Sequence, residues 1–337
     1  MVVVSAPIAG ATFGREITGV DLSVPLSPDD LAALQHELDE HALLVIPQQF
    51  DVSPERQATI YKALSPSDPA LRTYIDTNSH FPEQPEVHVF GNVDVDEYGL
   101  QVSLKPQVLT HDEGEARRTG VPDACGLYFH TDGSFFRTLP PVCTQLYCRV
   151  APPPETSAGV LHLPGGDVEY HSSATGFLDG RLAYDLLSAE RQRQLERLHV
   201  RYHPEIGGKI IREGLRISSN GLRMVAAEDA EDECGTANDR FDPSAFPTFG
   251  DLNTVRDMWP DGSEELHAYV ETDATGAACY PLVNTHPTTG RKGIVASAVA
   301  VDTLSETMEG EGSLGWARSQ ELLGEILEPA VRENGLF

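Results

Sequence analysis

Basic side chains are scarce in this sequence. Its 337 residues contain 24 Lys and Arg against 52 Asp and Glu, which gives a formal net charge of −28. Nucleic acids and anionic membranes recruit proteins through clusters of positive charge that displace counterions. The composition therefore argues against binding to either one. It favours an acidic surface whose role is solubility.

Cysteine is also infrequent, and long apolar runs are absent. The five Cys make an odd number with no C-x-x-C pair, which argues against a disulfide framework and a structural zinc site. We expect reduced thiols in a reducing, cytoplasmic compartment. No run approaches the 18 apolar residues of a spanning helix, and the first residues lack the pattern of a signal peptide.

Two Ser-Pro pairs predict helix starts. Ser27 and Ser53 each precede a Pro and an acidic residue, the order expected for an N-cap, a first helical position and a charge near the positive end of the helix dipole. The remaining hydrophobic pattern predicts further elements. We expect helices over 188–199 and 320–331, and strand-forming segments over 42–46, 84–94, 128–150 and 281–301.

Short strands with a few helices and no internal repeats predict an α+β fold. We expect a single domain over residues 1–337 with a double-sheet β core. Residues 226–275 are strongly acidic and lack periodicity, so they are predicted to form an inserted surface segment, either a lid or a decoration. The pair Gly165-Gly166 lacks the context of a phosphate-binding loop, so nucleotide binding has little support.

The segment Tyr128–Phe135 holds the most specific local pattern, a His and an Asp two residues apart. On an extended strand or its end, His130 and Asp132 would point to the same face. With a distant second His, they would form the two-His, one-carboxylate arrangement that binds iron(II) and leaves positions open. The H-x-D pattern alone is common, however, and an ordinary His–Asp hydrogen bond is the competing interpretation.

Four sequence blocks, taken in their order along the chain, add evidence on the role of this pattern. They are Thr18-Gly19-Val20-Asp21-Leu22-Ser23, His130-Thr131-Asp132-Gly133-Ser134-Phe135 with Pro140-Pro141, Gly165-Gly166-Asp167-Val168, and Pro281-Leu282-Val283-Asn284-Thr285-His286-Pro287 with Thr289-Gly290-Arg291-Lys292. Together they resemble the taurine-dioxygenase-like family (TauD/TfdA) of iron(II)- and 2-oxoglutarate-dependent oxygenases. The likeness covers most of the chain.

The resemblance implies a fold, a reaction and a site. The fold would be a double-stranded β-helix (jelly roll, cupin-like) with flanking helices. The enzyme would use Fe(II), 2-oxoglutarate as cosubstrate and O2 to hydroxylate or otherwise oxidise an unactivated C–H bond of a small molecule, releasing succinate and CO2. His130 and Asp132 would be catalytic iron ligands. Asn78, His80 and Phe81 would lie near the substrate, unless they belong to a polar surface loop.

The sequence departs from the family pattern in two places. Val168 stands where the family usually has a Thr that contacts the cosubstrate. The family's second iron-binding His and an Arg for 2-oxoglutarate are expected well after the 281–292 block, whereas the last His here is His286. The final core strands are accordingly expected to be absent. Arg291 and Lys292 either attract an anionic substrate or belong to a turn.

Three explanations of the missing ligand stay open. The sequence is a fragment or a truncated product, His286 or another His replaces the missing ligand, or the chain is a non-catalytic jelly-roll relative that binds a ligand or a partner. Assembly into a homo-oligomer is compatible with each of them.

Overall fold

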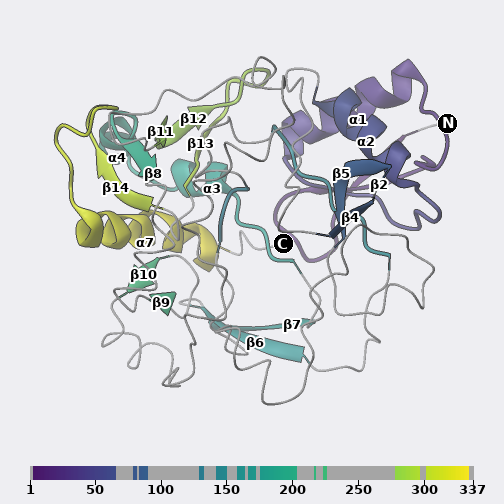
Figure 1. Ribbon diagram of the computed structural model, residues 1–337. Helices are drawn as coiled ribbons and strands as arrows, with labels where there is room; N and C mark the ends of the chain where they lie inside the picture. The colour runs from purple at the N-terminus through teal and green to yellow at the C-terminus, as the bar shows by residue number, and fades with distance from the viewer. Residues whose placement is uncertain are drawn as a thin grey trace.

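The computed structural model of the chain describes its two ends and several segments between them. The described ranges are 3–65, 79–81, 83–89, 129–132, 142–149, 158–163, 166–171, 175–202, 216–217, 223–225, 278–296 and 301–333. The predicted acidic insertion at 226–275 lies outside them. Figure 1 shows the N-terminal elements on one side of the molecule and the C-terminal elements on the other.

The N-terminal unit combines a small sheet with two helices. Its elements are β1 (Val4–Pro7), β2 (Arg15–Thr18), α1 (Pro28–His41), β3 (Leu44–Val45) and α2 (Pro54–Leu64). Strand β2 pairs antiparallel with β1 and parallel with β3. The apolar side chains of this unit form their own buried cluster of Ile17, Val20, Leu22, Leu34, Val52 and Ile60.

Both predicted helix starts are confirmed. The Ser27 hydroxyl accepts a hydrogen bond from the backbone N–H of Asp30, and the Ser53 hydroxyl accepts one from the N–H of Arg56. Each helix has Pro in its first turn. A side-chain acceptor thus satisfies one of the N–H groups that every helix start leaves without an intrahelical partner. Helix α1 ends at Ala42, a left-handed residue with φ of 62°.

Three antiparallel strand pairs lie between the two ends of the chain in the ranges that the structure describes. They are β4 (Ser79–Phe81) with β5 (Gln84–Val89), β6 (Ala158–Leu163) with β7 (Gly166–His171), and β9 (Arg216–Ile217) with β10 (Met224–Val225). All three are antiparallel pairs. The predicted strand over 84–94 is therefore confirmed as far as Val89.

The C-terminal unit packs a sheet against helices. Its elements are α3 (Gly180–Asp185), α4 (Ala189–Leu195), β8 (His199–Tyr202), β11 (Ala278–Pro281), β12 (Val283–Thr285), β13 (Lys292–Ile294), β14 (Val301–Ser305) and α7 (Trp316–Arg332). Strand β8 lies between β11 and β14, antiparallel to both. The strands predicted over 281–301 and the helix predicted over 320–331 are confirmed, and α7 starts earlier.

The larger hydrophobic core lies in this unit. Helix α7 turns one apolar face toward β14 and α3, so that its Leu322, Leu323, Ile326 and Leu327 are buried with residues of β8 and β14. An apolar stripe that repeats every three to four residues is the expected signature of such a helix. None of the helices in the described ranges combines the length and apolar composition that a bilayer crossing requires.

One prediction of local structure is wrong, and a second is wrong in the parts that the structure describes. The helix predicted over 188–199 ends at Leu195, because residues 199–202 pair with two neighbouring strands and alternate between half-buried and buried. The segment predicted to be strand-forming over 128–150 contains no strand in its described parts, 129–132 and 142–149. No described strand pairs with these residues, so they lack the backbone hydrogen bonds that define a strand.

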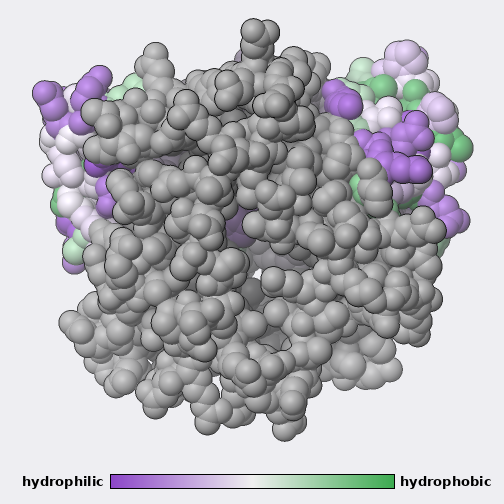
Figure 2. Space-filling model, viewed as in Figure 1, coloured by the Kyte–Doolittle hydropathy of each residue, from purple (hydrophilic) through white to green (hydrophobic). Residues whose placement is uncertain are grey.

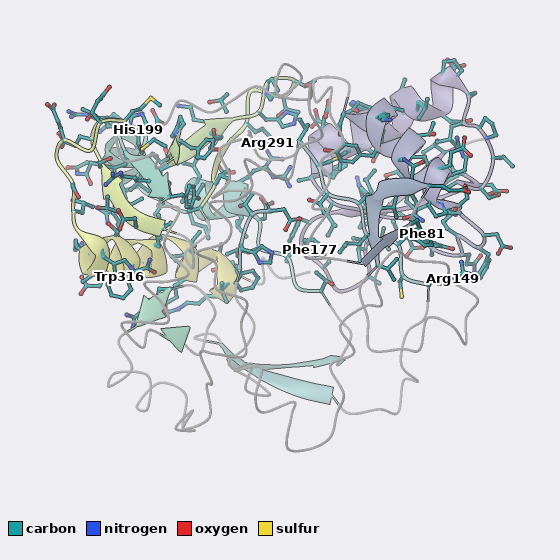
Figure 3. The ribbon with its side chains drawn as sticks, in the orientation of Figure 1. Phe81, Arg149, Phe177, His199, Arg291 and Trp316 are labelled. Atoms are coloured by element: carbon teal, nitrogen blue, oxygen red, sulfur yellow. The ribbon has the colours of Figure 1, made fainter. Side chains whose placement is uncertain are left out.

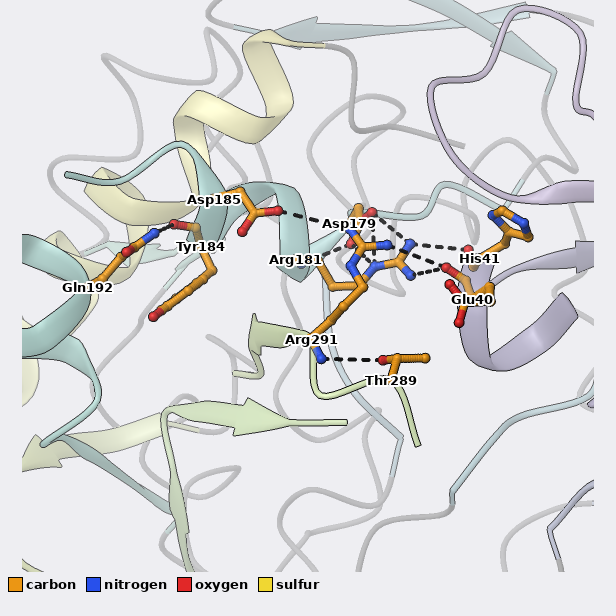
Figure 4. A network of polar contacts seen from close by, with 9 residues as sticks. All are labelled: Glu40, His41, Asp179, Arg181, Tyr184, Asp185, Gln192, Thr289 and Arg291. Carbon is orange, nitrogen blue, oxygen red and sulfur yellow. Dashed lines mark hydrogen bonds and ion pairs between the residues drawn. The ribbon is translucent and has the colours of Figure 1, made fainter. Parts of the chain in front are cut away.

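A guanidinium group joins the two units (Figure 4). Arg181 donates from Nε and Nη2 to the two carboxylate oxygens of Asp179, each at 2.9 Å. The same group donates to the backbone carbonyls of Glu40 at 2.9 Å and His41 at 3.2 Å, at the end of α1. Cations are favoured there because the last carbonyls of a helix lack partners and form the negative end of its dipole.

The residue between Asp179 and Arg181 is a glycine for a steric reason. A Cβ atom at Gly180 would lie 2.2 Å from the backbone carbonyl oxygen of Ile294 in β13. The start of α3 therefore touches β13 backbone to backbone. This contact fixes where Asp179 and Arg181 project.

We predict that Gly180→Ala lowers the free energy of unfolding by roughly 1–3 kcal/mol, the usual cost of overpacking a site whose neighbour is rigid. The midpoint of urea unfolding measures this. Gly324→Ala in α7 is the matched control, because there the new methyl group meets only the flexible side chain of Arg223 at 3.0 Å and helix propensity improves. Equal effects of the two substitutions would contradict the steric argument.

We also predict that Arg181→Lys destabilises the protein by roughly 2–3 kcal/mol, because an ammonium group keeps the charge but cannot make four hydrogen bonds in fork geometry. The Arg181 and Asp179 side chains are only 14% and 10% exposed, so water replaces the lost bonds poorly. Arg191→Lys is the control, since its pair with Glu325 is exposed and worth little. A cost below that of the control would exclude the proposed role of Arg181.

Candidate functional site

His130 and Asp132 lie side by side. His130 Nε2 is 3.3 Å from Asp132 Oδ1, and the two side chains are 46% and 47% exposed. They belong to the irregular segment 129–132, in which Phe129 packs against the larger core. The two side chains are therefore close together, as predicted, although residues 129–132 do not form a strand. A partly buried aromatic side chain holds the segment at its start.

A residue that the sequence did not single out completes the environment of the carboxylate. Thr144 Oγ1 donates a hydrogen bond of 2.8 Å to Asp132 Oδ2. Thr144 lies between Cys143, whose Sγ is 3.0 Å from the buried Ser65 Oγ at the end of α2, and Tyr147, which packs against the N-terminal cluster. One oxygen of Asp132 thus faces His130, and a hydroxyl group anchored to the other unit holds the second.

These contacts keep Asp132 ionised. The hydrogen bond with His130 has the largest influence on the pKa of the Asp132 carboxyl and lowers it. Partial burial works in the opposite direction, and the hydrogen bond from Thr144 lowers the pKa again. The net result is a pKa below the ordinary value for Asp, so the group is a carboxylate at neutral pH.

The donor set fits part of an iron site. An imidazole nitrogen and a carboxylate oxygen are suitable ligands for iron(II), and both lie within reach of one ion while remaining accessible. Within the described ranges, no group of three His, Cys, Asp or Glu side chains is close enough to hold a metal. The pair therefore supplies two ligands, and no described residue supplies the third.

In the part of the chain that the structure describes, His286 does not form a three-ligand group with His130 and Asp132. Its Nε2 lies 3.8 Å from Asp39 Oδ1 of α1, and its Nδ1 accepts a hydrogen bond from the backbone N–H of Thr289. The imidazole is thus part of the turn between β12 and β13. The hypothesis that His286 replaces the missing iron ligand is not supported by this placement.

The residues predicted to lie near a substrate are only partly described. Asn78 lies outside the described ranges. His80 and Phe81 belong to β4, and Phe81 is half-buried. Figure 3 shows Phe81 on the N-terminal side of the molecule, away from His199 and Trp316. A substrate-binding role for these three residues stays a prediction.

No sequence pattern indicates that Thr144 contacts Asp132. It is twelve residues from Asp132, and its hydroxyl reaches the carboxylate only because Cys143 and Tyr147 hold the segment against the N-terminal unit. A threonine in an apolar segment is equally consistent with ordinary β structure. The feature that identifies it is the hydrogen bond itself.

Comparison with known proteins identifies relatives of this chain. The sequence model of the family described as "Taurine catabolism dioxygenase TauD, TfdA family" matches residues 5–332. The alpha-ketoglutarate-dependent xanthine dioxygenase xan1 of Schizosaccharomyces pombe is 26% identical over 238 residues, which are 64% of this chain and 57% of xan1. The xanthine dioxygenase xanA of Emericella nidulans is 26% identical over 244 residues, 66% of each protein. The alignments thus span less than two thirds of either relative.

Solved structures of similar proteins are more distant. The crystal structure of AAD-2 in complex with Mn(II) and N-oxalylglycine is 16% identical, with a TM-score of 0.46 over 100% of this chain and 82% of that one. A taurine dioxygenase from Burkholderia xenovorans is 14% identical, with a TM-score of 0.48 over 99% of this chain and 75% of that one.

Proposed function

This chain belongs to the taurine catabolism dioxygenase TauD, TfdA family, and from that premise we propose that it is an Fe(II)- and 2-oxoglutarate-dependent dioxygenase. It would hydroxylate or otherwise oxidise an unactivated C–H bond of a small molecule and release succinate and CO2. The observation that carries the proposal is the accessible pair of His130 and Asp132, 3.3 Å apart.

Each residue of the site has a definite task in this proposal. The imidazole of His130 and the carboxylate of Asp132 would hold the iron. Bound iron together with 2-oxoglutarate and O2 would supply the oxidising power. Thr144 keeps one carboxylate oxygen occupied, which orients the other toward the metal. Outer hydrogen-bond partners of this kind commonly contribute 10–100-fold to metal affinity or activity.

We further propose the jelly-roll core of the family as the complete fold of this chain, organised as one domain over residues 1–337. The antiparallel pairings β8 with β11 and β14, and β6 with β7, are compatible with it. A cytoplasmic location and a homo-oligomeric state also remain proposals. The first is motivated by five cysteines without a C-x-x-C pair.

Xanthine is the first substrate to assay, because both relatives described above are named xanthine dioxygenases. The identity of 26% leaves the substrate open to experiment, since fold and family do not fix the contacts of a binding pocket. A set of small organic acids should be assayed in parallel.

We predict that the 337-residue protein converts 2-oxoglutarate to succinate with Fe(II), ascorbate and O2, even without a substrate. The variant His130→Ala should lose this turnover by about 100-fold or more, because loss of a ligand exceeds the effect of an outer partner. Succinate production is measured by chromatography. An inactive wild type that retains no iron would refute the oxygenase proposal for this chain and favour a non-catalytic relative.

We predict that Thr144→Val weakens Mn(II) binding by about tenfold, since the isosteric change removes only the hydroxyl that orients Asp132. Thr144→Ser should restore most of the affinity. Calorimetric titration with Mn(II) measures this without turnover, and the exposed position of Thr144 makes an effect on folding small. Identical affinities for the Val and Ser variants would exclude an orienting role.

A further inference from the structure

A second site is formed where the two units meet. A cavity of about 290 Å³ opens between the β1–β2 loop, the end of α1 and the start of α3. Three arginines line it, Arg15, Arg181 and Arg291. Neither His130 nor Asp132 is among its lining residues. Since the chain carries only 24 basic side chains against 52 acidic ones, three guanidinium groups around one cavity are an unusual concentration of positive charge.

The three arginines differ in how far their hydrogen-bonding capacity is used. Arg181 is committed, with Asp179 and two α1 carbonyls on its fork. Toward the described residues, Arg15 donates only from Nε, to His41 Nε2 at 3.2 Å. Its two terminal amino groups make no hydrogen bond to any described residue. They are therefore available to a ligand.

Arg291 is similarly available. Its contact with the Glu40 carbonyl is long, at 3.4 Å, and its distance to the Asp185 carboxylate is 4.0 Å. Both lie beyond the usual range of a strong hydrogen bond. Figure 3 shows Arg291 between the N-terminal and C-terminal sides, and Figure 4 shows it beside Arg181 and Asp185. Its side chain is 43% exposed, so a ligand can approach it from solvent.

Apart from the Asp185 carboxylate, 4.0 Å from Arg291, the nearby carboxylates that have hydrogen-bond partners are occupied by groups other than these two arginines. Asp179 is paired with Arg181, and Glu37 accepts a hydrogen bond from Ser5 at 2.5 Å. The imidazole of His41 accepts from Arg15, and burial, followed by the charge of Arg15, lowers the pKa of His41. It is therefore neutral at neutral pH. Glu40 alone presents a carboxylate to the cavity without a hydrogen bond from any described residue.

We propose that this cavity binds a small oxyanion, a carboxylate or a phosphate, through Arg15 and Arg291. Planar guanidinium groups bind both kinds of oxyanion through paired hydrogen bonds. A volume of about 290 Å³ is at the lower end of ligand pockets, so the ligand is of metabolite size. Glu40 lowers the affinity for bare anions and favours ligands that also offer a hydrogen-bond donor.

The test is calorimetric titration of the full chain with two probes, inorganic phosphate and malonate, at constant ionic strength set by chloride. We expect saturable binding of at least one probe. Binding of phosphate alone would assign a phosphate ligand, and binding of malonate alone a carboxylate ligand. The absence of saturable binding for both would overturn the proposal.

Variants assign the binding to the cavity. Arg15→Gln and Arg291→Gln should each weaken binding by about tenfold, because each removes charge-assisted hydrogen bonds. Glu40→Gln should strengthen it by removing a like charge. Arg318→Gln is the matched control, an exposed arginine of α7 that pairs with Glu321 and Glu325, and it should change nothing.

Folding is checked for each variant by circular dichroism. Where Arg15→Gln disturbs the fold, Arg15→Lys replaces it, with a smaller loss expected because the charge stays and the fork is removed. Wild-type affinity in both correctly folded arginine variants would overturn the assignment.

Discussion

The arrangement of the two units depends on the guanidinium group of Arg181. Each unit has its own apolar cluster, and the hydrophobic effect that stabilises such clusters has no preferred direction. Hydrogen bonds do have direction. Asp179, Gly180 and Arg181 are consecutive residues with separate tasks. The first caps α3 and orients the arginine, the second lets α3 touch β13, and the third donates hydrogen bonds to the last carbonyls of α1. This short segment therefore supplies the most extensive hydrogen bonding between the units, beside the smaller contacts of His286 with Asp39 and of Arg291 with the Glu40 carbonyl.

Local signals in the sequence predicted the parts of the fold that depend on neighbouring residues. Ser27 and Ser53 are sufficient to start their helices, because the capping hydrogen bond reaches only three residues. The end of α4 was missed because tertiary pairing of β8 decides it. The absence of a strand in the described parts of 128–150 has the same origin, since apolar composition cannot reveal whether a partner strand pairs with these residues.

The candidate site, like the fold, was predictable from the sequence only in part. His130 and Asp132 are two residues apart, so their proximity follows from almost any extended local conformation, and the ordered family blocks pointed to their chemistry. Their role as ligands remains a prediction. Thr144 and the arginine cavity were not predictable, because they depend on contacts between segments far apart in sequence. Arg15, Arg181 and Arg291 are far apart in sequence and line one cavity only in the folded chain.

The two anchors of the site belong to different cores. Phe129 fixes the ligand segment to the C-terminal core, whereas Tyr147 fixes the Thr144 segment to the N-terminal one. The hydrogen bond between Thr144 and Asp132 therefore spans the junction. By linkage, any ligand that binds Asp132 more tightly with this bond formed also stabilises the contact between the two cores, and loss of that contact lowers the affinity for the ligand by the same factor. Ligand affinity at the Asp132 carboxylate therefore reports on the contact between the two cores.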